Sequence, residues 1–202
     1  MVTSDAVQEA RAIFREHDGI LRTSEALALG VHPRTLYGMR DAGVLDRVAR
    51  GLYRLADMPP LSHPDLVTVA SKVPDGVICL VSALAFHDLT TEIPHAVDVA
   101  LEKGSRRPRL KHPPLRVFWF SGPAWREGVG VYQVDGVSVP ITTPAKTVAD
   151  IVKFRRQLGL DLALEALKAY RDRDTFDVDE LLHYARICRV RGVMEPYLEA
   201  LL

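Results

Sequence analysis

The stretch GILRTSEALALGVHPRTLYGMRDAGVLDRVARGLYRL, residues 19–55, determines the fold expected for the first part of this chain. Its first segment is expected to form a short helix. Thr23 is placed to cap its start, and Glu25 puts an acid in the first turn, where exposed amides and the helix dipole favour negative charge. The helix is expected to run through Ala28, and Gly30 supplies the turn that follows it.

A second helix is expected after this turn. Val31 enters it, and Pro33 lies in its first turn, where the missing backbone N–H costs no hydrogen bond. Leu36 and Met39 stand three residues apart and are expected to face inward. Gly43 ends the helix. Two helices joined by a short turn are typical of a helix-turn-helix.

The rest of the stretch predicts a β-hairpin. Arg50 and Gly51 form a glycine-containing reversal between two short extended segments. The apolar residues of these segments are Leu45, Val48, Leu52, Tyr53 and Leu55. A helix, a turn, a second helix and a hairpin in this order predict a winged helix-turn-helix, with the hairpin as its wing.

The charges of this unit favour duplex DNA as its partner. Between residues 31 and 55 there are five arginines and only two aspartates. Side chains at the start of the second helix can reach base edges, and those of the wing can neutralise phosphate. The alternative is an ordinary solvated helix with surface arginines. The candidate DNA contacts are His32, Arg34, Thr35, Tyr37 and Arg40 on the helix, and Arg47 and Arg50 on the wing.

Three blocks of the sequence resemble the AbiEi family of antitoxins, which belong to type IV toxin-antitoxin systems. The first is the helix-turn-helix and wing described above. The others are LVSALAFHDLTTEIPHAVDVAL, residues 80–101, and DGVSVPITTPAKTVADIVKF, residues 135–154. The most specific part of the resemblance is the occurrence of RGLYRL, SALAFHDLTTEIP and TTPAKTVADIV in that order.

This resemblance implies a function for each half of the chain. The winged domain is expected to repress its own operon, and the C-terminal domain to counter a cognate nucleotidyltransferase-like toxin. The TTPAKT segment belongs to the effector domain of the family, so Lys146 is a candidate toxin contact. Because a small winged domain has few basic groups, tight binding is expected at paired half-sites, so the promoter should carry inverted repeats.

Composition is that of an ordinary globular protein. The 202 residues carry 26 basic and 26 acidic side chains, so any affinity for DNA must come from local basic patches. Cys79 and Cys188 are interpreted as reduced core residues. No apolar run approaches the roughly 20 residues that cross a bilayer, and the first residues read as an amphipathic helix rather than a signal peptide. We therefore expect a cytoplasmic protein without membrane contact.

The chain is expected to divide into two domains. The proline-rich segment DMPPLSHPD places a boundary near Met58 to Leu61, which gives a winged domain at 1–60 and an effector domain at 61–202. The second domain begins with β-like segments and one helix, and its last third, from Pro144, has helical spacing. Thr143 is placed to cap that third, and Pro144 to occupy its first position. Strands first and helices afterwards predict a mixed α+β domain with a helical C-terminal third.

A second basic feature is GSRRPRLKHPPLR. Six basic residues and no acid occur from Lys103 to Arg116, between two predicted strands. This loop could contact phosphate or an acidic partner, or it could be a solvated connection. Its candidate DNA or toxin contacts are Arg106, Arg107, Arg109 and Lys111.

The sequence contains few features that would indicate an enzyme. The sequence has no metal-ligand helix pair, phosphate loop, nucleophile elbow or dinucleotide-binding motif, so no catalytic residue, metal or cofactor is predicted. The best enzymatic alternative is a nuclease, with Asp98, Glu102 and Lys103 at a strand end. Adjacent residues of a strand point to opposite faces, however, so Glu102 and Lys103 are wrongly spaced. His87, at a helix end, is interpreted as structural.

We therefore expect a cytosolic, non-enzymatic, two-domain regulator that binds DNA and acts as an antitoxin. One alternative is a stand-alone winged-helix transcription factor whose second domain senses a ligand or dimerises. Another is a divergent nuclease.

Overall fold

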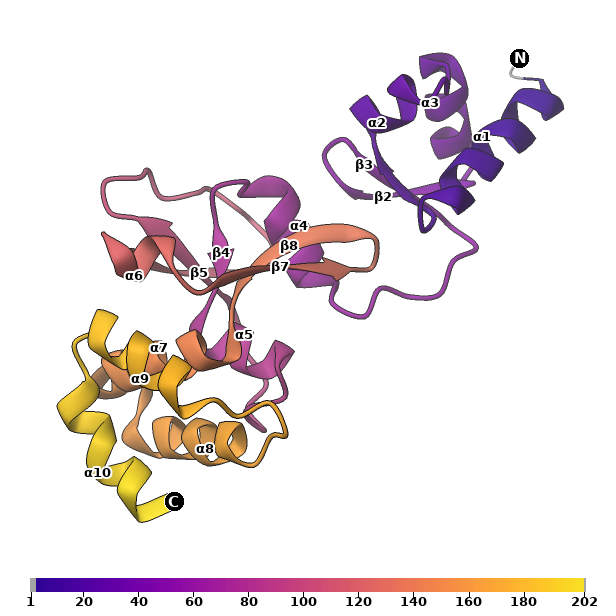
Figure 1. Cartoon of the computed structure of the whole chain (residues 1–202). Coiled ribbons are helices and arrows are strands. Elements are labelled where there is room, and N and C mark those ends of the chain that lie inside the picture. Colours follow the sequence, from indigo (N-terminus) through magenta and orange to yellow (C-terminus); the bar gives the residue numbers. More distant parts are fainter. Residues whose placement is uncertain (1–2, 202) are drawn as a thin grey trace. The chain divides into compact units, whose positions relative to one another are not determined.

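The computed structural model describes residues 3–201, which form two compact units (Figure 1). The first unit comprises residues up to Pro74 together with Tyr132–Val139, and the second comprises Asp75–Val131 and the residues from Pro140 onward. The compact first unit therefore extends beyond residue 60, the end expected for the winged domain. The expected division at that residue into a DNA-binding part and an effector part remains a proposal about function.

The first unit contains the helix-turn-helix and wing in the predicted order. Its elements are α1 (Ser4–Glu16), β1 (Ile20–Arg22), α2 (Thr23–Ala28), α3 (Pro33–Asp41), β2 (Leu45–Ala49), β3 (Leu52–Leu55) and α4 (Pro64–Lys72). Strand β3 lies between β1 and β2 and is antiparallel to both. Strand β1 is only three residues long and was not predicted from the sequence.

The core of this unit is formed by the apolar faces of its helices and strands. Phe14 of α1, Leu36 of α3 and Leu55 of β3 are each fully buried. Met39, one turn beyond Leu36, is 1% exposed. The inward orientation predicted for Leu36 and Met39 is therefore confirmed, and it turns the opposite side of α3 outward.

The expected cap of α2 was wrong. Thr23 is the first helical residue, and its hydroxyl donates to the carbonyl of Gly51 at 3.3 Å. The start of α2 is closed instead by Glu25, whose carboxylate accepts from the Arg22 amide at 2.7 Å. The hydroxyl of Thr23 therefore ties the helix start to the wing turn. Glu25 supplies the predicted negative charge in the first turn.

The second unit is a mixed sheet followed by helices, which confirms the α+β class. It contains β4 (Val77–Ile78), α5 (Leu80–Phe86), β5 (Val97–Glu102), β6 (Leu115–Phe120), α6 (Pro123–Arg126), β7 (Val129–Val134), β8 (Val137–Thr142), α7 (Pro144–Leu158), α8 (Leu160–Arg171), α9 (Val178–Ile187) and α10 (Arg191–Leu201). The strand order is β6-β5-β4-β8-β7, and the tip of the β7–β8 hairpin, Tyr132–Val139, is grouped with the first unit.

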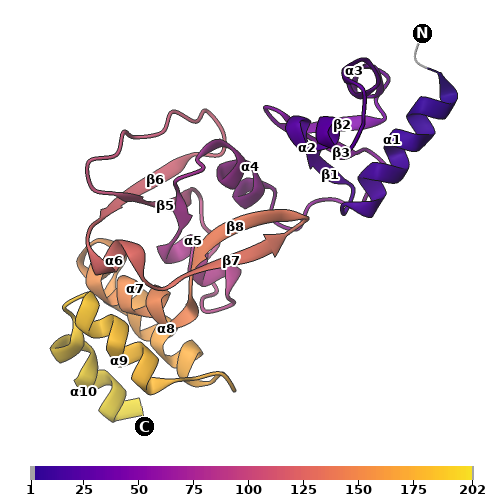
Figure 2. The same cartoon turned by 45° about the horizontal axis from the view of Figure 1, so that its top comes forward.

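The direction of the strands determines where the basic loop runs. Strand β4 is antiparallel to β5, whereas β5 is parallel to β6, with Val97 opposite Leu115 and Glu102 opposite Phe120. The connection 103–114 must therefore return along the length of the strands, because parallel neighbours cannot be joined by a tight turn. It does so as a long excursion without helix or strand (Figure 2).

The helical third packs onto one face of this sheet. Helix α7 contacts α5, α8 and α9. It begins after Thr143, with Pro144 in its first turn, as predicted, although the Thr143 side chain makes no capping hydrogen bond. Val148 and Ile151 of α7 are fully buried, and Phe118 of β6 packs in the same core.

Candidate nucleic-acid interface

The outward side of α3 carries several of the predicted base contacts. His32 is the N-cap residue, and Pro33 occupies the first position of the helix. His32 and Arg34 are exposed, and Tyr37 is 40% exposed. Three of the predicted contacts are therefore accessible to solvent.

The two arginines of α3 differ in whether their guanidinium groups have a partner. Within residues 3–201, the guanidinium of Arg34 has no hydrogen-bond or ion-pair partner. Arg40 donates to Asp41 at 2.8 Å and lies 5.2 Å from the centre of the Tyr37 ring. The hydrogen bond to Asp41 raises the pKa of Arg40 above its usual value. Arg34 is therefore available to an anion, whereas Arg40 must first leave Asp41.

The burial of Thr35 corrects one expectation. Its side chain is in the middle of the base-contacting set in sequence, but it is only 6% exposed. It lies one position before Leu36, and the inward face of this helix is wide enough to include both. Thr35 therefore belongs to the packed side of α3 and cannot reach a base edge.

The wing presents a separate pair of cations. Arg50 and Gly51 form its turn, with Gly51 in the left-handed region at φ 73°. Arg50 is exposed and without a partner in the described part of the chain. Arg47 is also exposed, and its side chain donates to the Ala49 carbonyl at 3.4 Å. Both side chains can therefore meet phosphate.

The basic loop of the second unit lies between two strands, as predicted, and is exposed. The side chains of Arg106, Arg107, Arg109 and Lys111 are exposed and have no ion-pair partner among the described residues. Arg116, at the end of the same basic run, is by contrast in an ion pair. It donates to both carboxylate oxygens of Asp98, at 2.6 and 2.8 Å. The free positive charge therefore lies in the loop and not on β6.

Asp98 has a structural environment that argues against the nuclease alternative. It is fully buried and accepts from the Val81 amide at 3.0 Å, at the start of α5. Burial raises the pKa of its carboxyl, and Arg116 acts in the opposite direction. A carboxylate held between a guanidinium and a helix start is not available to a metal ion or water. Among residues 3–201, no group of three His, Cys, Asp or Glu side chains could hold a metal.

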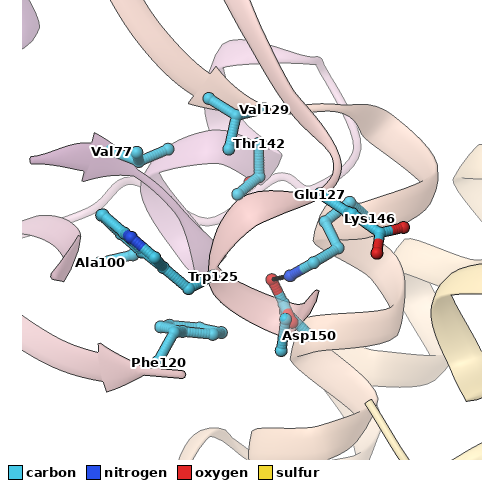
Figure 3. Close-up of a pocket in the computed structure, with 10 residues that line it drawn as sticks. Val77, Ala100, Phe120, Trp125, Glu127, Val129, Thr142, Lys146 and Asp150 are labelled. Carbon is cyan, nitrogen blue, oxygen red and sulfur yellow. Dashed lines mark hydrogen bonds and ion pairs between the residues drawn. The ribbon is translucent and has the colours of Figure 1, made fainter. Parts of the chain in front are cut away.

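Lys146 is not the surface contact that the resemblance implied. It is 1% exposed, and its ammonium forms an ion pair with Asp150, which is fully buried on the next turn of α7. Figure 3 shows the ammonium directed at Asp150, with Phe120 and Trp125 beside them. The Lys146 nitrogen lies 5.1 Å from the centre of the Phe120 ring. The cavity that these residues line is about 10 Å³, room for about one water molecule.

The cysteines are structural, as interpreted from the sequence. The Cys188 thiol donates to the second oxygen of Asp150 at 3.1 Å. Burial is the largest cause that raises the pKa of Cys188, to about 12, and it raises that of Cys79 as well. Buried thiols whose pKa is raised in this way stay protonated and unreactive near neutral pH. This cluster was not predicted from the sequence, although the i,i+4 spacing of Lys146 and Asp150 was a signal for a paired charge.

His87 also has the structural role expected of it. It is 7% exposed, and Nε2 donates to the Thr142 carbonyl at 2.7 Å. Arg173 donates to the His87 carbonyl at 2.8 Å. Burial lowers the pKa of the imidazole. The ring thus joins the end of α5 to the end of β8.

These features define a winged helix-turn-helix of the DNA-binding type, with free cations on its second helix and its wing. Residues 8–56 match the family described as transcriptional regulator, AbiEi antitoxin, which confirms the resemblance for this segment. The fold of the chain is similar to that in the crystal structure of RV2827C protein from Mycobacterium tuberculosis. That comparison has a TM-score of 0.54 and 13% identity, and covers 98% of this chain and 82% of the other. No curated protein matches the chain.

The chain offers no membrane-spanning helix in the part that the structure describes. None of the helices between residues 3 and 201 combines the length and apolar character that a bilayer crossing requires.

Proposed function

We propose that this protein is a DNA-binding transcriptional regulator that represses its own operon and counters a cognate nucleotidyltransferase-like toxin. The match of residues 8–56 to an antitoxin regulator family supports the proposal. The observation that carries it is Arg34 on α3, whose guanidinium has no partner among residues 3–201, together with the exposed Arg50 on the wing of the same unit. One side chain can reach a base edge while the other neutralises phosphate.

The DNA-binding part is tested by footprinting on the promoter of the protein's own operon. Repression by two copies predicts two protected half-sites, centred about one helical turn apart or a multiple of it. Affinity should fall steeply with salt, because the chain has no net charge and binding must rest on counterion release at local patches. A single unrepeated footprint would count against the proposed repression. Binding that is insensitive to salt would show that these cations do not neutralise phosphate.

The antitoxin part is proposed to depend on the exposed basic loop between β5 and β6. Its free cations would meet an acidic surface of the toxin, whereas the buried Lys146 serves the fold. The test is growth of cells that express a neighbouring nucleotidyltransferase-like gene together with this protein. Replacement of the loop arginines by glutamine should impair rescue and leave specific promoter recognition intact. The variant positions are Arg106, Arg107 and Arg109.

Arg126 provides a matched control for the loop variant. It is an exposed arginine of the same unit but lies on α6, outside the loop. Arg126→Gln should rescue as well as the parent protein. Full rescue by the loop variant, in a folded protein, would show that the loop is not the surface that meets the toxin.

A further inference from the structure

His32 holds the first turn of the recognition helix α3 through its own side chain. The backbone amide of Arg34 donates to Nδ1 of His32 at 3.1 Å. The backbone of His32 is extended, with φ −66° and ψ 139°, as an N-cap requires. Caps are usually Ser, Thr, Asp or Asn, whose oxygen accepts from an amide two or three residues on. Here an imidazole nitrogen does so.

This hydrogen bond fixes the tautomer of the ring. A backbone amide can only donate, so Nδ1 must present its lone pair and cannot carry a proton. A neutral imidazole carries one proton, which then lies on Nε2. Nε2 is on the side of the ring away from the capped amide, and the residue is exposed. His32 therefore offers an N–H donor, and no acceptor, to whatever contacts the start of α3.

A donor at this position distinguishes between base edges. The residues at the start of a recognition helix are those that reach into the major groove. The acceptors in that groove are the purine N7, guanine O6 and thymine O4 atoms, whereas adenine and cytosine present amino groups that are themselves donors. A ring that can only donate can form a hydrogen bond with one of these acceptor atoms. It cannot form one with the amino group of adenine or cytosine.

The cap also orients the ring before DNA arrives. Its Nδ1 is fixed to the Arg34 amide, and the following Pro33 restricts the backbone at the helix start. Holding a side chain in its bound orientation reduces the entropy lost on association. The neighbouring guanidinium of Arg34 has no such restraint from any residue between 3 and 201.

We propose that His32 is a specificity-determining residue, whose Nε2–H donates to an acceptor atom on a base edge while Nδ1 caps α3. This inference rests on the proposed DNA-binding function and deepens it. It assigns to one ring two coupled roles, because the cap removes the acceptor that a free histidine would also offer.

Three substitutions separate the cap from the contact. His32→Ser keeps a capping oxygen but is too short to reach a base. His32→Asn keeps a capping oxygen and supplies amide donors, and His32→Ala removes both functions. The full chain is used. The probes are a duplex selected by the parent protein from random sequences and an unrelated duplex of equal length at the same salt.

For His32→Ser we expect an unchanged melting temperature and affinity for the selected duplex reduced by about fivefold or more, the least effect of one lost base contact. Affinity for the unrelated duplex should not change. A selection repeated with this variant should lose its preference at one base pair. His32→Asn should recover part of the affinity, and His32→Ala should also lower the melting temperature.

Two results would overturn the inference while leaving DNA binding in place. If His32→Ser kept parental affinity for the selected duplex, the ring would be a cap only. If it lost affinity equally for both duplexes, the contact would be to phosphate. If the parent protein selected no preferred sequence at all, the proposed function would fail and the inference with it.

Discussion

Removal of the Lys146 charge should strongly destabilise the second unit. Lys146→Met keeps the length of the side chain and leaves the fully buried carboxylate of Asp150 without its cation. Breaking a buried ion pair by removing one partner costs about 3–5 kcal/mol, because the remaining charge is left unpaired. We expect a loss of about that size in the free energy of unfolding at pH 7. Cys188 cannot replace the ammonium, since a thiol is a weak donor without charge.

The assay is urea unfolding followed by tryptophan fluorescence. The chain has two tryptophans, Trp119 and Trp125, and both belong to the second unit. Their signal therefore reports on the unit that contains the ion pair. The double variant Lys146→Met, Asp150→Leu is the control. It should recover most of the loss, because apolar residues of similar volume often replace a buried pair without cost.

The loss should also depend on pH. Burial raises the pKa of Asp150 above its usual value of 3.8, and Lys146 acts to lower it. Without Lys146 the pKa should rise further. A carboxyl whose pKa is higher in the folded than in the unfolded chain favours folding below the unfolded value, and that stability is lost as pH rises to the folded value. The deficit of Lys146→Met should therefore shrink as pH is lowered from 7 towards 5.

One result would refute this reasoning. If Lys146→Met unfolded within about 1 kcal/mol of the parent protein at pH 7, with no change down to pH 5, the carboxylate would not be an uncompensated buried charge. This threshold of about 1 kcal/mol is the loss in the free energy of unfolding that an ordinary substitution causes.

Two other substitutions test contacts that the sequence did not predict. Asp41→Ala should release Arg40 from its ion pair, so the slope of log affinity against log salt on any duplex should steepen by about 0.9, the effect of one added phosphate contact. An unchanged slope would mean that Arg40 does not reach phosphate. Gly128→Ala should destabilise the second unit by about 1–3 kcal/mol, because φ is 73° and the new Cβ would lie 2.6 Å from Cβ and Cγ of Lys146. Urea unfolding measures this, and parental stability would show that α7 yields at this point.

The helix-turn-helix could be predicted because its signals are local. Pro33 at the start of α3 and Gly43 after its end mark the helix from sequence alone, and the spacing of Leu36 and Met39 gives its inward face. Strand β1 was missed because three residues are too few to show a period. Its pairing with β3 depends on residues some 30 positions away, which no local pattern contains.

The candidate contacts were predicted less completely, for a physical reason. Residue type identified Arg34 and Arg50 as cations, but not which cations are already paired. The pairing of Arg116 with Asp98 and of Lys146 with Asp150 became visible only with the fold. Thr35 was counted as accessible because the width of the buried face of α3 depends on what packs against it.

The central claim is that the free cations of the winged unit recognise DNA, each in its own way. The most direct measurement compares Arg34→Ala and Arg50→Ala on a duplex selected by the parent protein and on an unrelated duplex, with thermal melting to confirm folding. Arg34→Ala should lose about 1–3 kcal/mol on the selected duplex only, the value of a bidentate base contact, whereas Arg50→Ala should weaken both duplexes alike. A folded Arg34→Ala protein that keeps the parental ratio of the two affinities would contradict the account.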